Sequence, residues 1–430
     1  MLDQTTINIK IGIIGLGYVG LPLARLFATK FQTIGYDMNS ARCQEIMAGH
    51  DSTLEVPDYL LKEAVSSGRL TCTTCVDTIR DCNFYVIAVP TPVDDNMSPD
   101  LSFLIKASET LGSVLNKGDI AVFESTVYPG VTEDICGRII ERISELKLNE
   151  GFYLGYSPER INPGDREHTL ENTVKITSGS TQNAADIIDA VYRSVLKNGT
   201  YKVSSIKVAE AAKVIENSQR DLNIAFVNEL SKIFSRLGID THEVLDAAAT
   251  KWNFIKMNPG LVGGHCISVD PYYLAQCAIQ NGYNPEVILT GRRINNSMAG
   301  FVAEQTIKLM LKKNIQILEA EIIIMGFSFK ENCPDIRNTR VWDLYKALSE
   351  YNLKRIMVYD RWVDPELVYK EYGIKVVNTI PLEKFDAAVV AVAHREYRNN
   401  EIDFESLLKP THVIYDVKGI LPLEIIDGRL

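Results

Sequence analysis

A glycine-rich turn between a strand and a helix constrains this chain more than any other feature. Gly15, Gly17 and Gly20 stand in the pattern GxGxxG, directly after the apolar run 9–14 and before the helix-like stretch 21–30. Glycines at these places allow a tight turn and a close backbone approach to a pyrophosphate, whose charge a helix N-terminus favours. The turn therefore predicts a dinucleotide-binding unit, with a purely structural turn as the alternative.

An acidic residue closes the strand-like run that follows this helix. Asp37 is the last residue of the stretch 33–37. In dinucleotide-binding units an acid at this place accepts hydrogen bonds from the ribose hydroxyls, and its charge repels a 2′-phosphate. The sequence therefore predicts NAD rather than NADP as the cofactor.

The N-terminal half of the chain alternates between strand-like and helix-like stretches. Short apolar runs suited to buried parallel strands occur at residues 9–14, 33–37, 84–89, 120–124 and 152–156, with helix-compatible stretches between them. Alternation of this kind predicts a doubly wound parallel α/β sheet.

A long helix and a second α/β unit follow. Residues 205–238 carry apolar side chains at helical spacing, with a glycine after the last turn, and residues 302–313 form another helical region. Strand-like runs then recur at residues 322–325, 356–359, 387–392 and 413–415. We therefore expect an α/β protein with two Rossmann-like doubly wound parallel-sheet domains, joined by a long central helix that is a candidate dimer interface.

Composition limits the partners of such a protein. Of its 430 residues, 46% are hydrophobic and 23% charged, and the net charge of -10 argues against bulk neutralisation of nucleic-acid phosphates. The sequence has neither a signal-peptide pattern nor an apolar run long enough to span a membrane, so the expected location is cytoplasmic, without membrane partners. The eight cysteines are then expected to be thiols. The CxxC at Cys72 and Cys75 lacks a second ligand pair, so no metal site is predicted.

Two polar residues lie one turn apart on the predicted long helix. Lys213 and Asn217 are at positions i and i+4 and therefore project from one face. Such a pair usually belongs to a solvated face, but the apolar residues Ala212, Val214 and Ile215 around it leave open that this face lines a cleft.

The segment around Cys266 is the most distinctive candidate for chemistry. Gly263 and Gly264 remove side chains from the neighbourhood of this thiol, as a nucleophile approached by a bulky substrate requires, and Asp270 follows four residues later. The alternative is a buried, inert cysteine.

Several loops follow strand-like runs and are candidate ligand contacts. The VPTP loop at 89–92 and the ESTVYPG loop at 124–130 are either such contacts or simple turns. Lys330 and Arg337, which follow the run 322–325, are suitable partners for diphosphate oxygens, unless they are merely solvated surface charges.

Taken in chain order, these segments closely resemble the UDP-glucose/GDP-mannose dehydrogenase family over essentially the whole chain. The motifs that carry the resemblance are GLGYVG, the acid at Asp37, VPTP, ESTVYPG, SPER at 157–160, AEAAKVIEN at 209–217, GGHC and FSFKEN. The segments 157–164, 251–254 and 330–339 further resemble the branch that acts on UDP-N-acetylhexosamines, the UDP-N-acetylglucosamine and UDP-N-acetylgalactosamine 6-dehydrogenases of Vi-antigen and O-antigen pathways.

The resemblance implies a catalytic set and a reaction. The set consists of the nucleophile Cys266, the oxyanion-stabilising Lys213 and Asn217, and Thr126, Glu159 and Asp270, which handle water and protons. The implied reaction is an NAD-dependent four-electron oxidation of the C6 alcohol of UDP-GlcNAc or UDP-GalNAc to the uronate, through a thiohemiacetal and a thioester of the cysteine. Its product would enter surface polysaccharides such as capsule or O-antigen.

The resemblance also implies binding residues. NAD contacts are implied at Gly15, Gly17, Tyr18, Val19, Gly20, Asp37, Arg42, Thr91, Pro92, Ser125, Thr126 and Arg337. Contacts with the UDP-sugar substrate are implied at Glu159, Arg160, Lys213, Asn217, Lys251, Gly260, Gly263, Phe329 and Lys330, and Lys251 would reach a neighbouring subunit's substrate. The chain departs from the UDP-glucose enzymes at residues 417–419, Val-Lys-Gly, where those enzymes carry an arginine pair near the substrate.

Three regions and a homodimer or higher homo-oligomer are expected on this basis. They are an NAD-binding Rossmann-like domain at 1–202, a central helical dimerisation region with the cysteine at 203–300, and a UDP-sugar-binding Rossmann-like domain at 301–430. UDP-ManNAc or UDP-glucose as the substrate remains an alternative. A non-catalytic regulator that binds NAD and a nucleotide sugar is the alternative from another class, although it would have no use for Cys266, Lys213 and Asp270 together.

Overall fold

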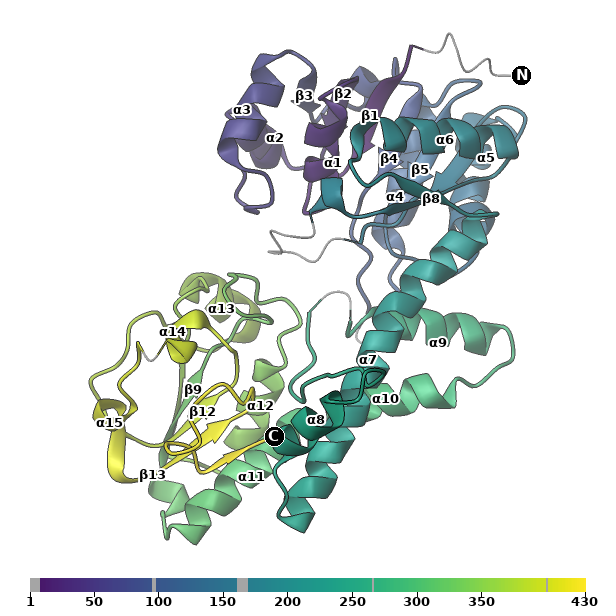
Figure 1. Cartoon of the computed structure of the whole chain (residues 1–430). Coiled ribbons are helices and arrows are strands. Elements are labelled where there is room, and N and C mark those ends of the chain that lie inside the picture. Colours follow the sequence, from purple (N-terminus) through teal and green to yellow (C-terminus); the bar gives the residue numbers. More distant parts are fainter. Residues whose placement is uncertain (1–7, 95–97, 161–168, 265–266, 400) are drawn as a thin grey trace. The chain divides into compact units, whose positions relative to one another are not determined.

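A computed structural model describes residues 8–94, 98–160, 169–264, 267–399 and 401–430. The chain divides into two units, Met1–Glu216 and Asn217–Leu430, and the division falls within the long helix α7 (Ile206–Leu237). Each unit contains one sheet flanked by helices (Figure 1).

The first unit has an eight-stranded sheet with the strand order β3-β2-β1-β4-β5-β6-β7-β8. The strands are β1 (Lys10–Ile14), β2 (Gln32–Tyr36), β3 (Leu70–Thr73), β4 (Phe84–Ile87), β5 (Ile120–Phe123), β6 (Tyr153–Tyr156), β7 (Lys175–Gly179) and β8 (Thr200–Lys202). The order of β1 to β6 is that of a Rossmann fold, which confirms the predicted doubly wound sheet. One difference is that β7 pairs with β6 in the antiparallel direction.

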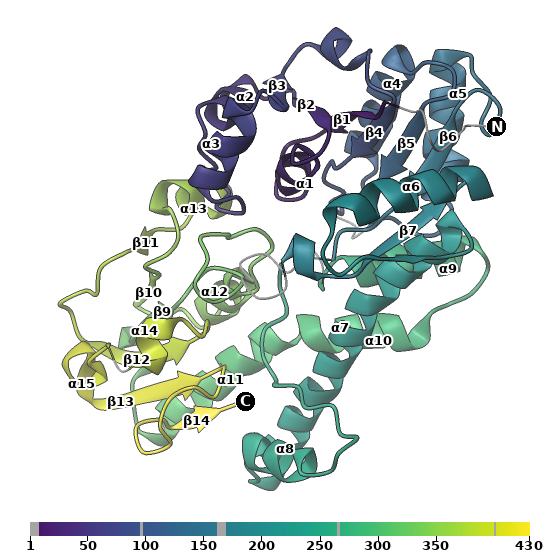
Figure 2. The same ribbon diagram turned by 45° about the horizontal axis from the view of Figure 1, so that its top comes forward.

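The central strands of this sheet are apolar on both faces because helices cover both. Phe84 and Val86 of β4 pack into one core cluster, and Tyr85 and Ile87, which point the opposite way, pack into another. The first face is covered by α1 (Gly20–Phe27), α2 (Ser40–Met47), α3 (Asp58–Ser66) and α6 (Gln182–Val195), and α6 can be followed in Figure 2. The other is covered by α4 (Ser102–Val114), the π-helical turn η2 (Val131–Gly137) and α5 (Arg138–Ser144).

The second unit has a six-stranded parallel sheet with the order β11-β10-β9-β12-β13-β14. The strands are β9 (Glu321–Met325), β10 (Arg355–Tyr359), β11 (Val376–Val377), β12 (Phe385–Val390), β13 (Leu408–Asp416) and β14 (Gly428–Arg429). One face packs against α11 (Met298–Lys312), α12 (Val341–Ser349) and α13 (Pro365–Tyr372), and the other against α14 (Arg395–Arg398) and α15 (Phe404–Leu407). This is the second Rossmann-like sheet that the sequence predicts.

Helices connect the two sheets. The helix predicted at 205–238 is α7, and it ends before Gly238, whose φ of +68° gives the left-handed turn that terminates many helices. It is followed by α8 (Thr241–Ala249), α9 (Asp270–Gln280) and α10 (Glu286–Asn296). In the described part of the chain, no helix is both long enough and apolar enough to cross a bilayer.

Candidate active site

The glycine turn after β1 has the geometry that the sequence predicts. Gly15 has a φ of +92°, and its N–H donates to the carbonyl of Tyr36 over 2.9 Å. The N–H of Leu16 donates to Oδ2 of Asp37 over 2.9 Å, and Oδ1 of the same carboxylate accepts from the N–H of Asn39. The acid predicted to bind the ribose therefore also fixes the turn on which a pyrophosphate would rest.

The two later glycines of this turn serve different purposes, and a pair of variants separates them. A Cβ at Gly20 would lie 1.8 Å from the carbonyl oxygen of Gly15, whereas a Cβ at Gly17 would meet nothing within 4 Å. We expect Gly20→Ala to cost about 2 to 3 kcal/mol of stability by overpacking, which thermal denaturation measures. We expect Gly17→Ala to keep the wild-type melting temperature but to raise the KM for NAD, because the sequence predicts that the pyrophosphate passes over this backbone. An unchanged KM in Gly17→Ala would show that it does not.

Arg42 contacts the backbone of the glycine turn. Its Nε donates to the carbonyl of Leu16 over 2.9 Å, and its guanidinium forms ion pairs with Asp51 at 2.8 Å and Glu45 at 3.0 Å. Asp51 is buried, and no sequence pattern pointed to its role. Arg42 thus acts on the cofactor turn through the backbone, and its direct contact with NAD stays a prediction.

The VPTP and ESTVYPG loops are joined to each other at the carboxyl ends of β4 and β5. The hydroxyl of Thr91 donates to the carbonyl of Thr126 over 2.8 Å, and the hydroxyl of Ser125 donates to the carbonyl of Val89 over 2.6 Å. Because β1, β4 and β5 are parallel neighbours, these loops share one edge of the sheet with the glycine turn. This is the edge where open α/β sheets bind ligands, and the contacts of these loops with NAD stay a prediction.

A buried glutamate that the sequence analysis missed ties the second of these loops to α7. The carboxylate of Glu210 accepts from the N–H groups of Gly130 at 2.6 Å and Thr132 at 2.9 Å. Burial raises the pKa of Glu210 to about 7. Glu210 lies three residues before Lys213 on the helix, so it links the ESTVYPG loop to the helix that carries this candidate catalytic residue.

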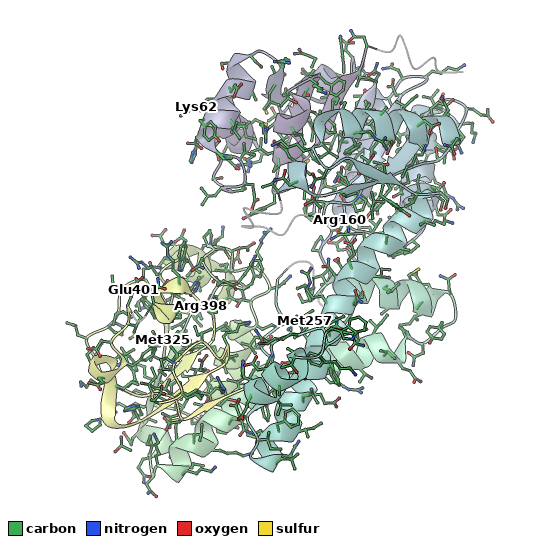
Figure 3. All side chains as sticks on the ribbon, in the orientation of Figure 1. Lys62, Arg160, Met257, Met325, Arg398 and Glu401 are labelled. Atoms are coloured by element: carbon green, nitrogen blue, oxygen red, sulfur yellow. The ribbon has the colours of Figure 1, made fainter. Side chains whose placement is uncertain are left out.

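The SPER segment follows β6, and both of its charged residues have partners. Glu159 Oε2 lies 3.4 Å from Nζ of Lys175, which also contacts Glu124 at 2.7 Å. Arg160, labelled in Figure 3, pairs with Glu216 of α7 at 2.6 Å. Residues 161–168, which continue the motif, lie outside the described residues. Sequence patterns gave no sign of Lys175, because a lysine at the start of a strand usually faces solvent.

Lys213 and Asn217 do not lie on a solvated face. Their relative exposures are 6% and 7%, and that of Asp270 is 2%. The amide Nδ2 of Asn217 donates to Oδ2 of Asp270 over 2.5 Å. Asp270 is the first residue of α9, so this hydrogen bond fixes the start of α9, just after the Cys266 segment, against α7.

The predicted nucleophile, Cys266, lies outside the described residues, but the two glycines before it are described. A Cβ at Gly263 would lie 2.6 Å from the carbonyl oxygen of Asn338. Gly264 has a φ of +88°, and a Cβ there would lie 2.7 Å from the ring of Phe329. The glycine pair therefore lets the backbone that leads to the cysteine pack directly against the loop that follows β9.

A small cavity in the second unit gathers several predicted substrate residues. Phe329, Lys330 and Gly263 line it, and so do two cations that the sequence analysis had not assigned to the substrate, Arg340 and Lys418. The rest of its lining consists of Leu261, Ser328, Glu331, Thr339, Val341, Ala391 and Val392. Burial lowers the pKa of Lys418. A lining with three cationic side chains and one aromatic ring is chemically suited to a nucleoside diphosphate.

Gly260 precedes Leu261, which lines this cavity. The side-chain amide of Asn228 makes two hydrogen bonds to the backbone of Gly260. It accepts from the N–H over 2.8 Å and donates to the carbonyl over 3.1 Å. A Cβ at Gly260 would lie 3.1 Å from Nζ of Lys418. Lys418 belongs to the segment 417–419, in which this chain departs from the arginine pair of the UDP-glucose enzymes.

Two predicted binding residues, Arg337 and Lys251, belong neither to the glycine turn nor to the lining of the cavity. Arg337 forms a two-point ion pair with Asp335, its neighbour in the loop after β9. It belongs to the second unit and Asp37 to the first, so their joint contact with NAD stays a prediction. Lys251 is exposed after α8, and its predicted contact with another subunit's substrate also stays a prediction.

The second sheet has a glycine turn like that of the first, but the acid beside this turn is buried. Gly326, with a φ of +95°, donates to the carbonyl of Tyr359, just as Gly15 does to its own neighbour strand. The equivalent acid, Asp360, accepts from the N–H of Phe327 at 2.6 Å and lies 3.1 Å from Nε2 of the fully buried His394. Because Asp360 is fully buried with these partners, it is not available to ribose hydroxyls, unlike the partly exposed Asp37.

Comparison with known families accounts for nearly the whole chain. Three models of the UDP-glucose/GDP-mannose dehydrogenase family match it, the NAD binding domain at residues 9–196, the central domain at 207–297 and the UDP binding domain at 323–422. The chain belongs to this family. It is an NAD-dependent dehydrogenase with a UDP-sugar as its class of substrate, and the open space over Gly17 and the acid at Asp37 fit NAD.

Relatives and solved structures of the family match over the full length. The chain is 54% identical to a UDP-N-acetyl-D-glucosamine 6-dehydrogenase of Salmonella typhi over 98% of this chain and 99% of that protein. It is 51% identical to one of Pseudomonas aeruginosa over 98% and 100% of the two chains. The structure of a UDP-D-ManNAc dehydrogenase from Pyrococcus horikoshii matches with a TM-score of 0.88 at 30% identity, covering 98% of each chain.

Proposed function

We propose that this enzyme oxidises the C6 alcohol of a UDP-N-acetylhexosamine, UDP-GlcNAc or UDP-GalNAc, to the uronate. The substrate class is supported by the names of the two relatives that are more than half identical over nearly the whole chain. The observation that carries the chemistry is the buried hydrogen bond between Asn217 and Asp270. It fixes the helix that bears Lys213 next to the segment that follows Cys266.

The proposed catalytic roles follow from the charge that develops at C6. When bound, NAD supplies the hydride acceptor for both oxidation steps. The Cys266 thiolate adds to the aldehyde, and the resulting thiohemiacetal is oxidised to a thioester. Lys213 and Asn217 stabilise the oxygen anion of each tetrahedral stage, and Lys213 favours the thiolate. Thr126, Glu159 and Asp270 position water and carry protons during hydrolysis.

The cavity beside β9 is the proposed site of the UDP moiety. Phe329 would stack on the base or sugar, and Lys330, Arg340 and Lys418 would neutralise the diphosphate. Arg160, Gly260 and Gly263 are proposed to border the sugar, and Tyr18, Val19, Thr91, Pro92 and Ser125 to contact NAD.

The proposal extends to assembly and pathway. Exposed apolar residues follow one stripe of α7 at helical spacing, namely Val208, Ile215, Phe226, Ile233 and Leu237. An unpaired stripe of this length favours a homodimer or higher homo-oligomer. The division into regions 1–202, 203–300 and 301–430, with the central one as the dimerisation region, is proposed on the same basis. Likeness to the Vi-antigen and O-antigen branch favours a product destined for surface polysaccharide.

An NADH assay across four UDP-sugars tests the function. With purified enzyme, UDP-GlcNAc or UDP-GalNAc should give the highest kcat/KM, and exhaustion of a limiting amount of sugar should release two NADH per sugar. A preference for UDP-ManNAc or UDP-glucose would replace the substrate assignment. One NADH per sugar would indicate a simple alcohol dehydrogenase, and no NADH with any of the four would favour a non-catalytic regulator.

A further inference from the structure

The direction of β7 brings a lysine to the catalytic edge of the first sheet. β7 runs antiparallel to β6, with Ser178 opposite Tyr156. Its first residue, Lys175, is therefore carried beyond the carboxyl end of β6, where the chain continues to Glu159. A parallel strand in this place would have put its first residue at the opposite edge of the sheet.

Lys175 is almost completely buried and is fully hydrogen-bonded. Its side chain is 3% exposed, and Nζ lies 2.7 Å from Oε2 of Glu124, 2.9 Å from the carbonyl oxygen of Pro158 and 3.4 Å from Oε2 of Glu159. An ammonium has three N–H donors, so these three acceptors satisfy it. The side chain bridges the loop after β5 and the loop after β6.

The charged groups around Glu159 come from four elements. Glu124, after β5, is fully buried and accepts from the hydroxyl of Tyr192 on α6, and burial raises its pKa to about 7. Arg160 donates its backbone N–H to Oε1 of Glu159 over 2.6 Å, while its guanidinium pairs with Glu216 of α7. Lys175, at the start of β7, is thus the ammonium that both carboxylates contact.

We propose that Lys175 is a positioning residue, which holds Glu159 in one orientation at the carboxyl edge of the sheet, while Glu124 and Tyr192 anchor the ammonium. The inference rests on the proposed function, in which Glu159 is the base of the hydrolytic step. There, a water O–H bond breaks and its proton passes to Glu159. The water oxygen bonds to the thioester carbon, and the C–S bond breaks to return the Cys266 thiolate and release the carboxylic acid.

A double variant removes the ammonium without leaving a buried charge unbalanced. In Lys175→Met combined with Glu124→Gln, one cation and one anion disappear together, so folding is protected. Glu159 loses the ammonium that orients it. We expect kcat at pH 7 to fall about 100-fold while the KM values stay near those of the wild type. A rapid burst of two NADH per site should then precede slow turnover, because only hydrolysis is impaired.

Two single variants make the test specific to charge. Lys175→Arg keeps the cation and should recover most of the kcat that the double variant loses. Glu124→Gln alone leaves the ammonium beside Glu159 and should lower kcat much less than the double variant does. A wild-type kcat without the NADH burst in the double variant, or an equal loss of kcat in Glu124→Gln alone, would overturn the inference. Wild-type enzyme that fails to release two NADH per sugar would instead overturn the proposed function.

Discussion

Replacing Cys266 with serine is expected to stop formation of the uronate while leaving the fold and NAD binding intact. A serine hydroxyl is far less acidic than a thiol, so it does not supply a ready nucleophile for the aldehyde at neutral pH. Any ester that does form is also hydrolysed more slowly than a thioester. Overall turnover should fall on the order of 10³-fold or more, since a covalent nucleophile contributes more than a single oxyanion donor.

Cys277→Ser is the matched control for this substitution. Cys277 lies in the same unit, on α9, where its sulfur is 3.9 Å from Nδ2 of Asn281. The Cys277→Ser variant should keep turnover near that of the wild type. Steady-state NADH formation and intact-protein mass spectrometry measure both variants, and a covalent sugar adduct on Cys266→Ser would mark the stalled ester. Uronate production by Cys266→Ser at the wild-type rate would exclude a cysteine-bound intermediate.

The parts of the fold that the sequence predicts are those with a strong local signal. The turn at Gly15 combines an apolar strand, spaced glycines and a following helix, so its chemistry is visible in consecutive residues. The same is true of α7, whose end at Gly238 was predicted because a left-handed residue there almost requires glycine. Helical spacing alone places Lys213 and Asn217 on one face of the helix, but it does not predict that this face is buried.

The contacts of the buried polar residues join segments that are far apart in the sequence, so the sequence alone could not predict them. Lys175 meets Glu124 only because β7 turns antiparallel, and strand direction leaves no mark in the strand's own residues. In the sequence, Glu210 is an ordinary helix glutamate. Its hydrogen bonds depend on the packing of α7 against η2. Asp360 has the sequence context of Asp37, and only the burial of His394 against it distinguishes the two acids.

Replacing Lys213 with methionine should lower kcat by about 100- to 1,000-fold and leave both KM values nearly unchanged. Methionine has a side chain of similar length and suits a position that is only 6% exposed, so the fold should tolerate it. The lost ammonium matters chiefly when C6 carries an oxygen anion, which exists in the tetrahedral stages and not in the bound alcohol. Steady-state kinetics with each substrate varied in turn separates kcat from KM.

Lys207→Met on the same helix separates this effect from a general loss of positive charge. The side chain of Lys207 is 54% exposed and forms a surface ion pair with Asp134 at 3.0 Å. Exposed pairs of this kind contribute little, so kcat should stay within about twofold of the wild type. If Lys213→Met instead raised the KM for the UDP-sugar at constant kcat, its charge would bind the ground state, and stabilisation of the oxyanion would have to come from Asn217 alone.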